Sequence, residues 1–235
     1  MNIYRNPGRS DWSALLRRPV MDHAVLEKSV QDVLNAVKQR GDQALIELTQ
    51  RFDGVLLPTL KVSEAEWLAA EQELATELKH SINQAKHNIE KFHAAQIKPA
   101  EVIETMPGVR CWRKSVGIEK VGLYIPGGSA PLFSTVLMLG VPAVLAGCRD
   151  IILCTPPDKN AKIHPAVLYA AKVAGITQVF KAGGAQAIAA MAYGTETIPK
   201  VYKIFGPGNQ YVTAAKQLVQ RDGIAIDMPA GPSEV

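Results

Sequence analysis

Three glycine-rich loops in the second half of the sequence carry side chains that could bind a ligand. Each loop places one polar side chain beside its glycines: Tyr124 before Pro126-Gly127-Gly128, Gln186 after Gly183-Gly184, and Asn209 after Gly206-Pro207-Gly208. Glycines let the backbone approach a ligand closely. A helix that begins after such a loop directs free N–H groups and its positive end at an anion such as a phosphate. The loops therefore indicate a site for a phosphate-bearing ligand, with a phenol for stacking and two amides for hydrogen bonding.

Each of these side chains also has a reading that needs no ligand. Tyr124 could be a packed aromatic at a strand end, Gln186 a surface residue, and Asn209 the N-cap of a helix. None of the loops matches G-x-G-x-x-G or G-x-x-x-x-G-K-[ST], so no standard nucleotide fingerprint supports them. Asn209 can combine both roles, because a capped helix still presents free N–H groups.

Strands and helices are expected to alternate around these loops. We expect strands at 121–125, 151–154, 178–181, 201–205 and 224–227, and helices at 130–146, 164–174, 185–193 and 209–220. Repeated strand–helix units with short connections predict an α/β fold, a parallel sheet covered by helices on both faces. Ligands bind such sheets beyond the carboxyl ends of the strands. The three loops should therefore share one edge.

The first half of the sequence predicts mainly helices. Residues 1–20 are expected to form an irregular arm. Asp22 can cap a helix to Arg40 that Gly41 interrupts, and a second piece should run from Asp42 to about Asp53. The predicted apolar face of the first helix comprises Val25, Val30, Val33, Leu34 and Val37.

Further along, 55–62 predicts a short strand or a loop. Ser63 and Glu66 match a capping box, which predicts a helical region from there to about Gln96. Its expected buried stripe consists of Leu68, Leu74, Leu78, Ile82 and Ile89. Pro107-Gly108, between the runs 102–105 and 109–114, predicts a hairpin.

Composition divides the chain near Lys120 and narrows the function classes. Residues 121–235 hold only 15 of the 48 charged residues but 13 of the 18 glycines, which indicates a domain boundary.

The net charge of +4 is spread out, so we expect no nucleic-acid partner, and no apolar run is long enough to predict a membrane span. The three cysteines form no paired framework, which favours reduced thiols in a cytoplasmic protein. No serine lies in G-x-S-x-G, and the histidines at 80, 87 and 93 lack zinc spacing.

Four motifs together resemble the histidinol dehydrogenase family. They are V-G-L-Y-I-P-G-G-S-A-P-L-F-S-T-V-L-M-L from Val121, G-G-A-Q-A-I-A-A from Gly183, K-I-F-G-P-G-N from Lys203, and I-D-M-P-A-G-P-S-E-V from Ile226. The resemblance runs from about Asp22 to Val235 and covers the N-terminal half or so of the family's chain. It implies an NAD-dependent, zinc-containing homodimer that oxidises L-histidinol to L-histidine through the aldehyde.

The resemblance also assigns residues and domains. By motif, Tyr124, Gln186 and Asn209 match the family's NAD contacts, and Ser233 matches a substrate contact. Residues 124–232 would be an inserted Rossmann-like domain, 21–123 the first part of an interrupted α/β domain, and 233–235 the start of the return to it. The zinc ligands and the acid/base pair are expected beyond Val235, so we assign no metal ligand and no catalytic residue here and expect this chain alone to be inactive.

Two other readings remain open. One is a non-catalytic module or remnant that binds a nucleotide or a phosphate sugar at the glycine loops. The other is a related zinc- and NAD-dependent dehydrogenase of a different amino or sulfonated alcohol. Gene context and the sequence after position 235 would separate these readings from the main one.

Overall fold

A five-stranded parallel sheet lies at the centre of the computed structural model, which describes residues 4–16, 23–128 and 130–228. Its strands are β3 (Lys120–Tyr124), β4 (Asp150–Thr155), β5 (Gln178–Lys181), β6 (Lys203–Phe205) and β7 (Ala225–Ile226). They lie in the order β5-β4-β3-β6-β7, and every neighbouring pair is parallel. The chain builds outward from β3 in one direction and then, from β6, in the other. This confirms the predicted α/β fold and places the switch in strand order between β3 and β6.

Helices cover both faces of this sheet, as the sequence predicts. The covering helices are α5 (Phe133–Leu145), α6 (Pro165–Val173), α7 (Gly184–Tyr193) and α8 (Gln210–Arg221). Successive strand side chains point to opposite faces. Val121 and Leu123 therefore pack in the core with α5 and α6, whereas Tyr124 packs in the other core with α7 and α8.

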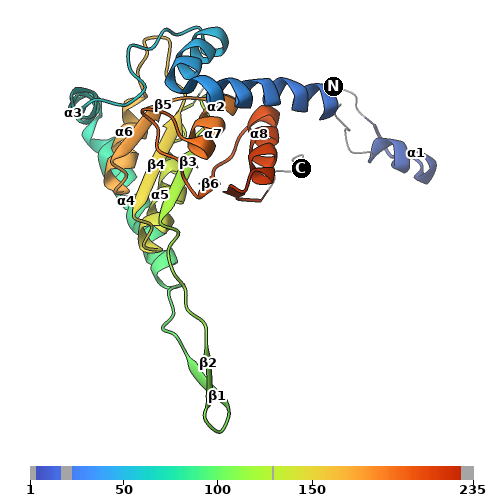
Figure 1. The fold of residues 1–235 in the computed structure, drawn as a ribbon, viewed down its shortest axis with the longest axis vertical. Helices are drawn as coiled ribbons and strands as arrows, with labels where there is room; N and C mark the ends of the chain where they lie inside the picture. Colours follow the sequence, from blue (N-terminus) through green and yellow to red (C-terminus); the bar gives the residue numbers. More distant parts are fainter. Residues whose placement is uncertain (1–3, 17–22, 129, 229–235) are drawn as a thin grey trace.

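Three helices of the first half form outer layers on this framework (Figure 1). Helix α2 (His23–Asp53) packs on α7 and α8, α3 (Glu64–Glu73) on α6, and α4 (Thr76–Ala94) on α5. The division into an inserted and an interrupted domain stays a prediction. None of the helices described here is both long and apolar enough to span a membrane.

Two expectations for the N-terminal region need correction. Residues Arg9–Leu15 form helix α1 instead of an irregular arm, because Pro7-Gly8 precede the helix and no breaker lies within it. Val25 is 70% exposed, whereas Val30, Leu34 and Val37 are buried as predicted. Gly41 does interrupt the helix, with φ 51° and ψ −128° inside α2. Asp22 lies outside the described residues.

The capping box is confirmed, but the helical region after it is not continuous. The Ser63 side chain accepts from the Glu66 N–H, and the Glu66 carboxylate accepts from the Ser63 N–H. Leu74 is buried in an extended conformation and separates α3 from α4. Because of this break, the residues of the expected stripe do not share one continuous helix face. Leu68, in α3, is 61% exposed instead of buried.

Residues 55–62 and the hairpin complete the fold. Lys61 pairs antiparallel with Phe180 at the edge of β5, so the segment extends the sheet by a short bridge. The predicted hairpin is confirmed as β1 (Val102–Met106) and β2 (Val109–Trp112). It projects from the rest of the chain (Figure 1), and all of its strand residues are exposed.

Candidate functional site

A cavity of about 730 Å³ lies at the carboxyl ends of the central strands. Tyr124, Gln186 and Asn209, the side chains that the sequence singles out on three separate loops, all line it. Glycines 127, 128 and 184 line it as well. The expectation that the loops share one edge of the sheet is therefore correct, and the cavity lies where doubly wound sheets bind ligands.

Tyr124 is both a packed aromatic and a wall of the cavity. It is the last residue of β3 and is almost fully buried. Its hydroxyl oxygen accepts a hydrogen bond of 3.0 Å from the Gly184 N–H at the start of α7. Burial raises the pKa of Tyr124 to about 12, so the phenol stays protonated at neutral pH. Its O–H remains a donor at the cavity wall.

Gln186 is not the surface residue that one reading of the sequence expected. It lies in the first turn of α7 and is only 2% exposed. Gln186 lines the cavity, so its amide can bond a ligand there.

Asn209 is the N-cap of α8. Its Oδ1 accepts from the N–H groups of Tyr211 and Val212, each at 3.1 Å, which confirms the capping role. One amide oxygen serves both bonds, so the Nδ2 donors of the same side chain remain for the cavity. Capping and ligand binding are therefore compatible in this geometry.

Sequence reasoning missed the contribution of helix α2 to the cavity wall. Ser29, Val30 and Val33 come from its first part, and Phe52 and Asp53 from its last turn. The turn at Gly41 lets both arms of one helical segment reach the same cavity. Ser29 and Asp53 lie more than twenty residues apart and belong to no local motif, so nothing in the sequence indicates that they line one cavity.

The charged groups of the cavity have different roles. Desolvation raises the pKa of Asp53. Asp158 is engaged in its own loop, because its Oδ1 accepts from the N–H groups of Asn160 and Lys162, each at 2.8 Å. Lys159 lines the cavity as well and supplies a positive charge. The wall thus combines apolar surface with a few polar groups, as small-molecule sites do.

Within the ranges that the structure describes, no three His, Cys, Asp or Glu side chains gather as metal ligands. The described residues therefore do not fit a zinc ion. Ser233, the substrate contact implied by the resemblance, lies outside the described residues.

The chain is similar to known proteins over nearly its whole length. The model of the family described as histidinol dehydrogenase matches residues 16–235. The histidinol dehydrogenase of Bacteroides fragilis is 60% identical over 235 residues, which are 100% of this chain and 55% of that protein. That of Xanthomonas euvesicatoria is 54% identical over 96% of this chain and 54% of its own length.

A solved structure agrees with these matches. The crystal structure of histidinol dehydrogenase from Elizabethkingia anophelis superposes with a TM-score of 0.91 at 56% sequence identity. The match covers 98% of this chain and 53% of that one, so the chain spans about half the length of the relatives it matches. With the family match over residues 16–235, these relatives show that the chain belongs to the histidinol dehydrogenase family, whose members are oxidoreductases.

Proposed function

We propose that this chain carries the NAD-binding part of a histidinol dehydrogenase, which oxidises L-histidinol to L-histidine through the aldehyde in histidine biosynthesis. One observation carries the proposal: side chains from three separate strand–helix loops line a single cavity at the switch point of the sheet. A volume of about 730 Å³ lies within the usual range for ligand sites, about 300–1,000 Å³.

In this proposal the chain binds and orients the dinucleotide, which supplies the hydride acceptor when it is bound. The N-terminus of α7 has no side-chain cap from its N-cap residue Gly183. The Gly184 N–H bonds the Tyr124 hydroxyl, which leaves the N–H groups of Ala185 and Gln186 to hold a phosphate. The Gln186 and Asn209 amides would bind ribose or base groups, and the Tyr124 hydroxyl would fix the loop at Gly184 while donating into the cavity.

The substrate, the metal and the assembly rest on the family alone. We propose L-histidinol as the substrate, with Ser233 as one contact, zinc as a second cofactor, and a homodimer as the functional assembly in the cytoplasm. No metal-ligand cluster occurs in the described part of the chain, so we expect the 235-residue protein to bind NAD without oxidising histidinol.

Isothermal titration of NAD into the purified chain tests the proposal. We expect saturable binding, and Gln186→Leu should weaken it about three- to tenfold, because one or two hydrogen bonds of about 0.5–1.5 kcal/mol are lost. Gln217→Leu, on the far turns of α8 away from the cavity, serves as a matched control with unchanged affinity.

Three results would contradict parts of this proposal. Unchanged NAD affinity in Gln186→Leu would remove Gln186 from the cofactor contacts. Steady NADH production from histidinol by the 235-residue chain would contradict the assignment of chemistry to residues outside it. Absence of any NAD binding would refute the proposed function itself.

A further inference from the structure

A largely buried ion pair contacts the Gly206-Pro207-Gly208 loop. Lys216 on α8 pairs with Asp227, which follows β7, and their side chains are 7% and 26% exposed. Both partners also contact the backbone of one residue. Lys216 Nζ donates to the Gly206 carbonyl oxygen at 3.0 Å, and the Gly206 N–H donates to Asp227 Oδ2 at 2.8 Å.

Gly206 is a residue whose backbone needs such contacts. Its φ is +135°, and a Cβ there would lie 2.0 Å from the Tyr124 carbonyl oxygen, so only glycine allows this close approach to the end of β3. The next residue is Pro207, which has no N–H to donate. The loop is thus held mainly through the two polar groups of Gly206, and Asn209 follows it directly as the cap of α8.

We propose that Lys216 and Asp227 are the positioning residues of this loop, and that they set Asn209 in its place at the cavity. The part concerning the cofactor rests on the proposed function. Buried ion pairs often add little net stability compared with apolar residues of similar size. An ion pair that satisfies both polar groups of one glycine instead fixes a particular backbone path.

The pair also joins two separate stretches of sequence at the switch point. Asp227 lies at the end of β7, beside β6 in the sheet, whereas Lys216 lies midway along the helix that the loop begins. Their contact therefore closes a ring through β6, the loop, α8 and β7. Loss of the pair should free the loop while leaving the two hydrophobic cores intact.

The test replaces both charges at once, so that no single buried charge is left unpaired. In the 235-residue protein, Lys216→Met/Asp227→Leu should melt close to the unaltered protein. Amide hydrogen exchange at Tyr211 and Val212 should nevertheless become about tenfold faster or more, because their N–H groups bond Asn209 and touch neither replaced residue. NAD affinity should fall about fivefold or more.

Glu71→Leu/Lys172→Met provides the matched control. It removes a pair of 2.6 Å whose side chains are about half exposed, on α3 and α6. Exchange at Tyr211 and Val212, and NAD affinity, should not change in this control.

The positioning role would be overturned if both amides exchange at wild-type rates in the folded double variant. It would also be overturned if the wild type binds NAD and the double variant binds it with equal affinity. A wild-type protein without NAD affinity would refute the proposed function instead, and the exchange measurement would still decide the role of the pair. If the double variant fails to fold, Asp227→Asn takes its place. It should show the same faster exchange to a smaller extent, and wild-type rates there would overturn the proposal.

Discussion

At the scale of single residues, Asn209 combines a structural role with a proposed binding role. Its Oδ1 caps α8 through two backbone N–H groups, and the same side chain lines the cavity. A substitution to alanine removes both functions together and therefore cannot separate them. Serine separates them, because its hydroxyl can cap a helix but offers no amide to a ligand.

We therefore predict different results for two substitutions at this position. Asn209→Ala should lower the free energy of unfolding by about 1 kcal/mol and also weaken NAD binding. Asn209→Ser should leave the free energy of unfolding within about 0.5 kcal/mol of wild type and still weaken NAD binding about three- to tenfold. Urea unfolding and calorimetric titration measure the two quantities. Full NAD affinity in Asn209→Ser would leave Asn209 with the cap alone.

The sequence predicted the cavity residues that lie beside glycine loops and missed those that do not. Tyr124, Gln186 and Asn209 could be found because their loops follow predicted strands of one sheet. Ser29 and Asp53 could not, since their place depends on how α2 turns at Gly41 and packs on α7 and α8. Such packing is a property of the folded chain and not of any local pattern.

At the scale of elements, one carboxylate joins the start of α3 to the edge of the sheet. Glu66 completes the capping box and also pairs at 2.6 Å with Lys181, the last residue of β5, which is buried. Burial disfavours the charged carboxyl, but hydrogen bonds from Lys181 and Ser63 outweigh it and lower the pKa of Glu66. The ionised form therefore stabilises the fold.

Glu66→Gln should lower the free energy of unfolding at pH 7 by about 2 kcal/mol, because buried Lys181 loses its charged partner. A lowered pKa in the folded state means that this contribution is present at neutral pH and is lost as the pH falls through that pKa. The difference between wild type and Glu66→Gln should therefore shrink on acidification. Urea unfolding across this range measures it.

Glu71→Gln is the control for this prediction. Glu71 also pairs with a lysine at 2.6 Å, but both side chains are about half exposed, so little change is expected at any pH. A Glu66→Gln effect that stayed constant with pH would show that the carboxylate charge is not what stabilises this contact.

The sequence located most elements and misplaced some of their ends for identifiable reasons. Strong local signals held: the capping box at Ser63, the interruption at Gly41, and the Pro-Gly turn of the hairpin. The break at Leu74 was not visible, because an apolar residue at helical spacing looks the same whether it continues a helix or leaves it to enter a core.

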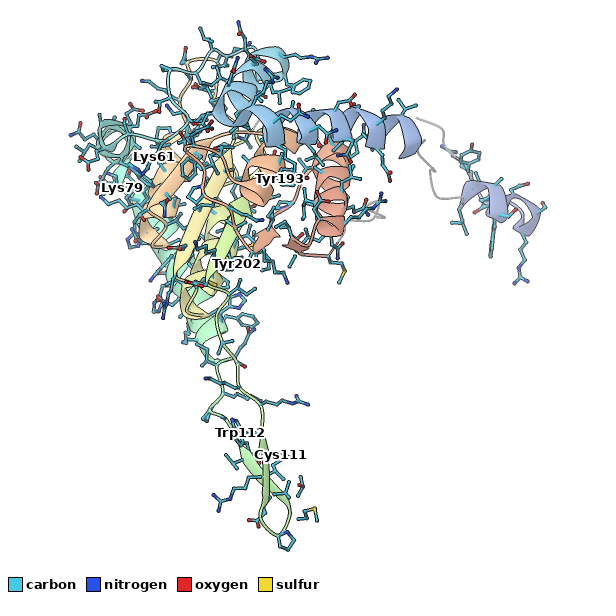
Figure 2. All side chains as sticks on the ribbon, viewed as in Figure 1. Lys61, Lys79, Cys111, Trp112, Tyr193 and Tyr202 are labelled. Carbon is cyan, nitrogen blue, oxygen red and sulfur yellow. The ribbon has the colours of Figure 1, made fainter. Side chains whose placement is uncertain are left out.

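At the scale of the whole molecule, the two halves of the chain are joined by specific contacts. The Asp42 N–H donates to Glu196 Oε2 at 2.8 Å, and the Asp42 carboxylate accepts from the Thr197 N–H and hydroxyl. These contacts tie the turn within α2 to the segment after α7. The hairpin stands apart from this arrangement: Cys111 and Trp112 lie on it well away from the sheet (Figure 2), and its strand residues are exposed.

Removal of the hairpin should therefore leave the stability of this chain unchanged. Replacing residues 99–114 by Gly-Ser-Gly-Ser removes both strands and closes the chain at the open end of the hairpin, where Val102 lies opposite Trp112. We expect the melting temperature to stay within about 2 °C of wild type, because exposed residues contribute little to the free energy of unfolding. The exposed apolar surface should decrease, which a fall in binding of an apolar dye would detect.

Leu60→Ala shows whether the same melting experiment detects a real loss. Leu60 is buried, and its carbonyl accepts from the Lys181 N–H at 2.7 Å, so truncation should lower the free energy of unfolding by about 2–5 kcal/mol. A hairpin excision that destabilised the chain as much as Leu60→Ala would mean that the hairpin packs on the body in solution. A neutral excision would mean that the hairpin contributes little to the free energy of unfolding of this chain.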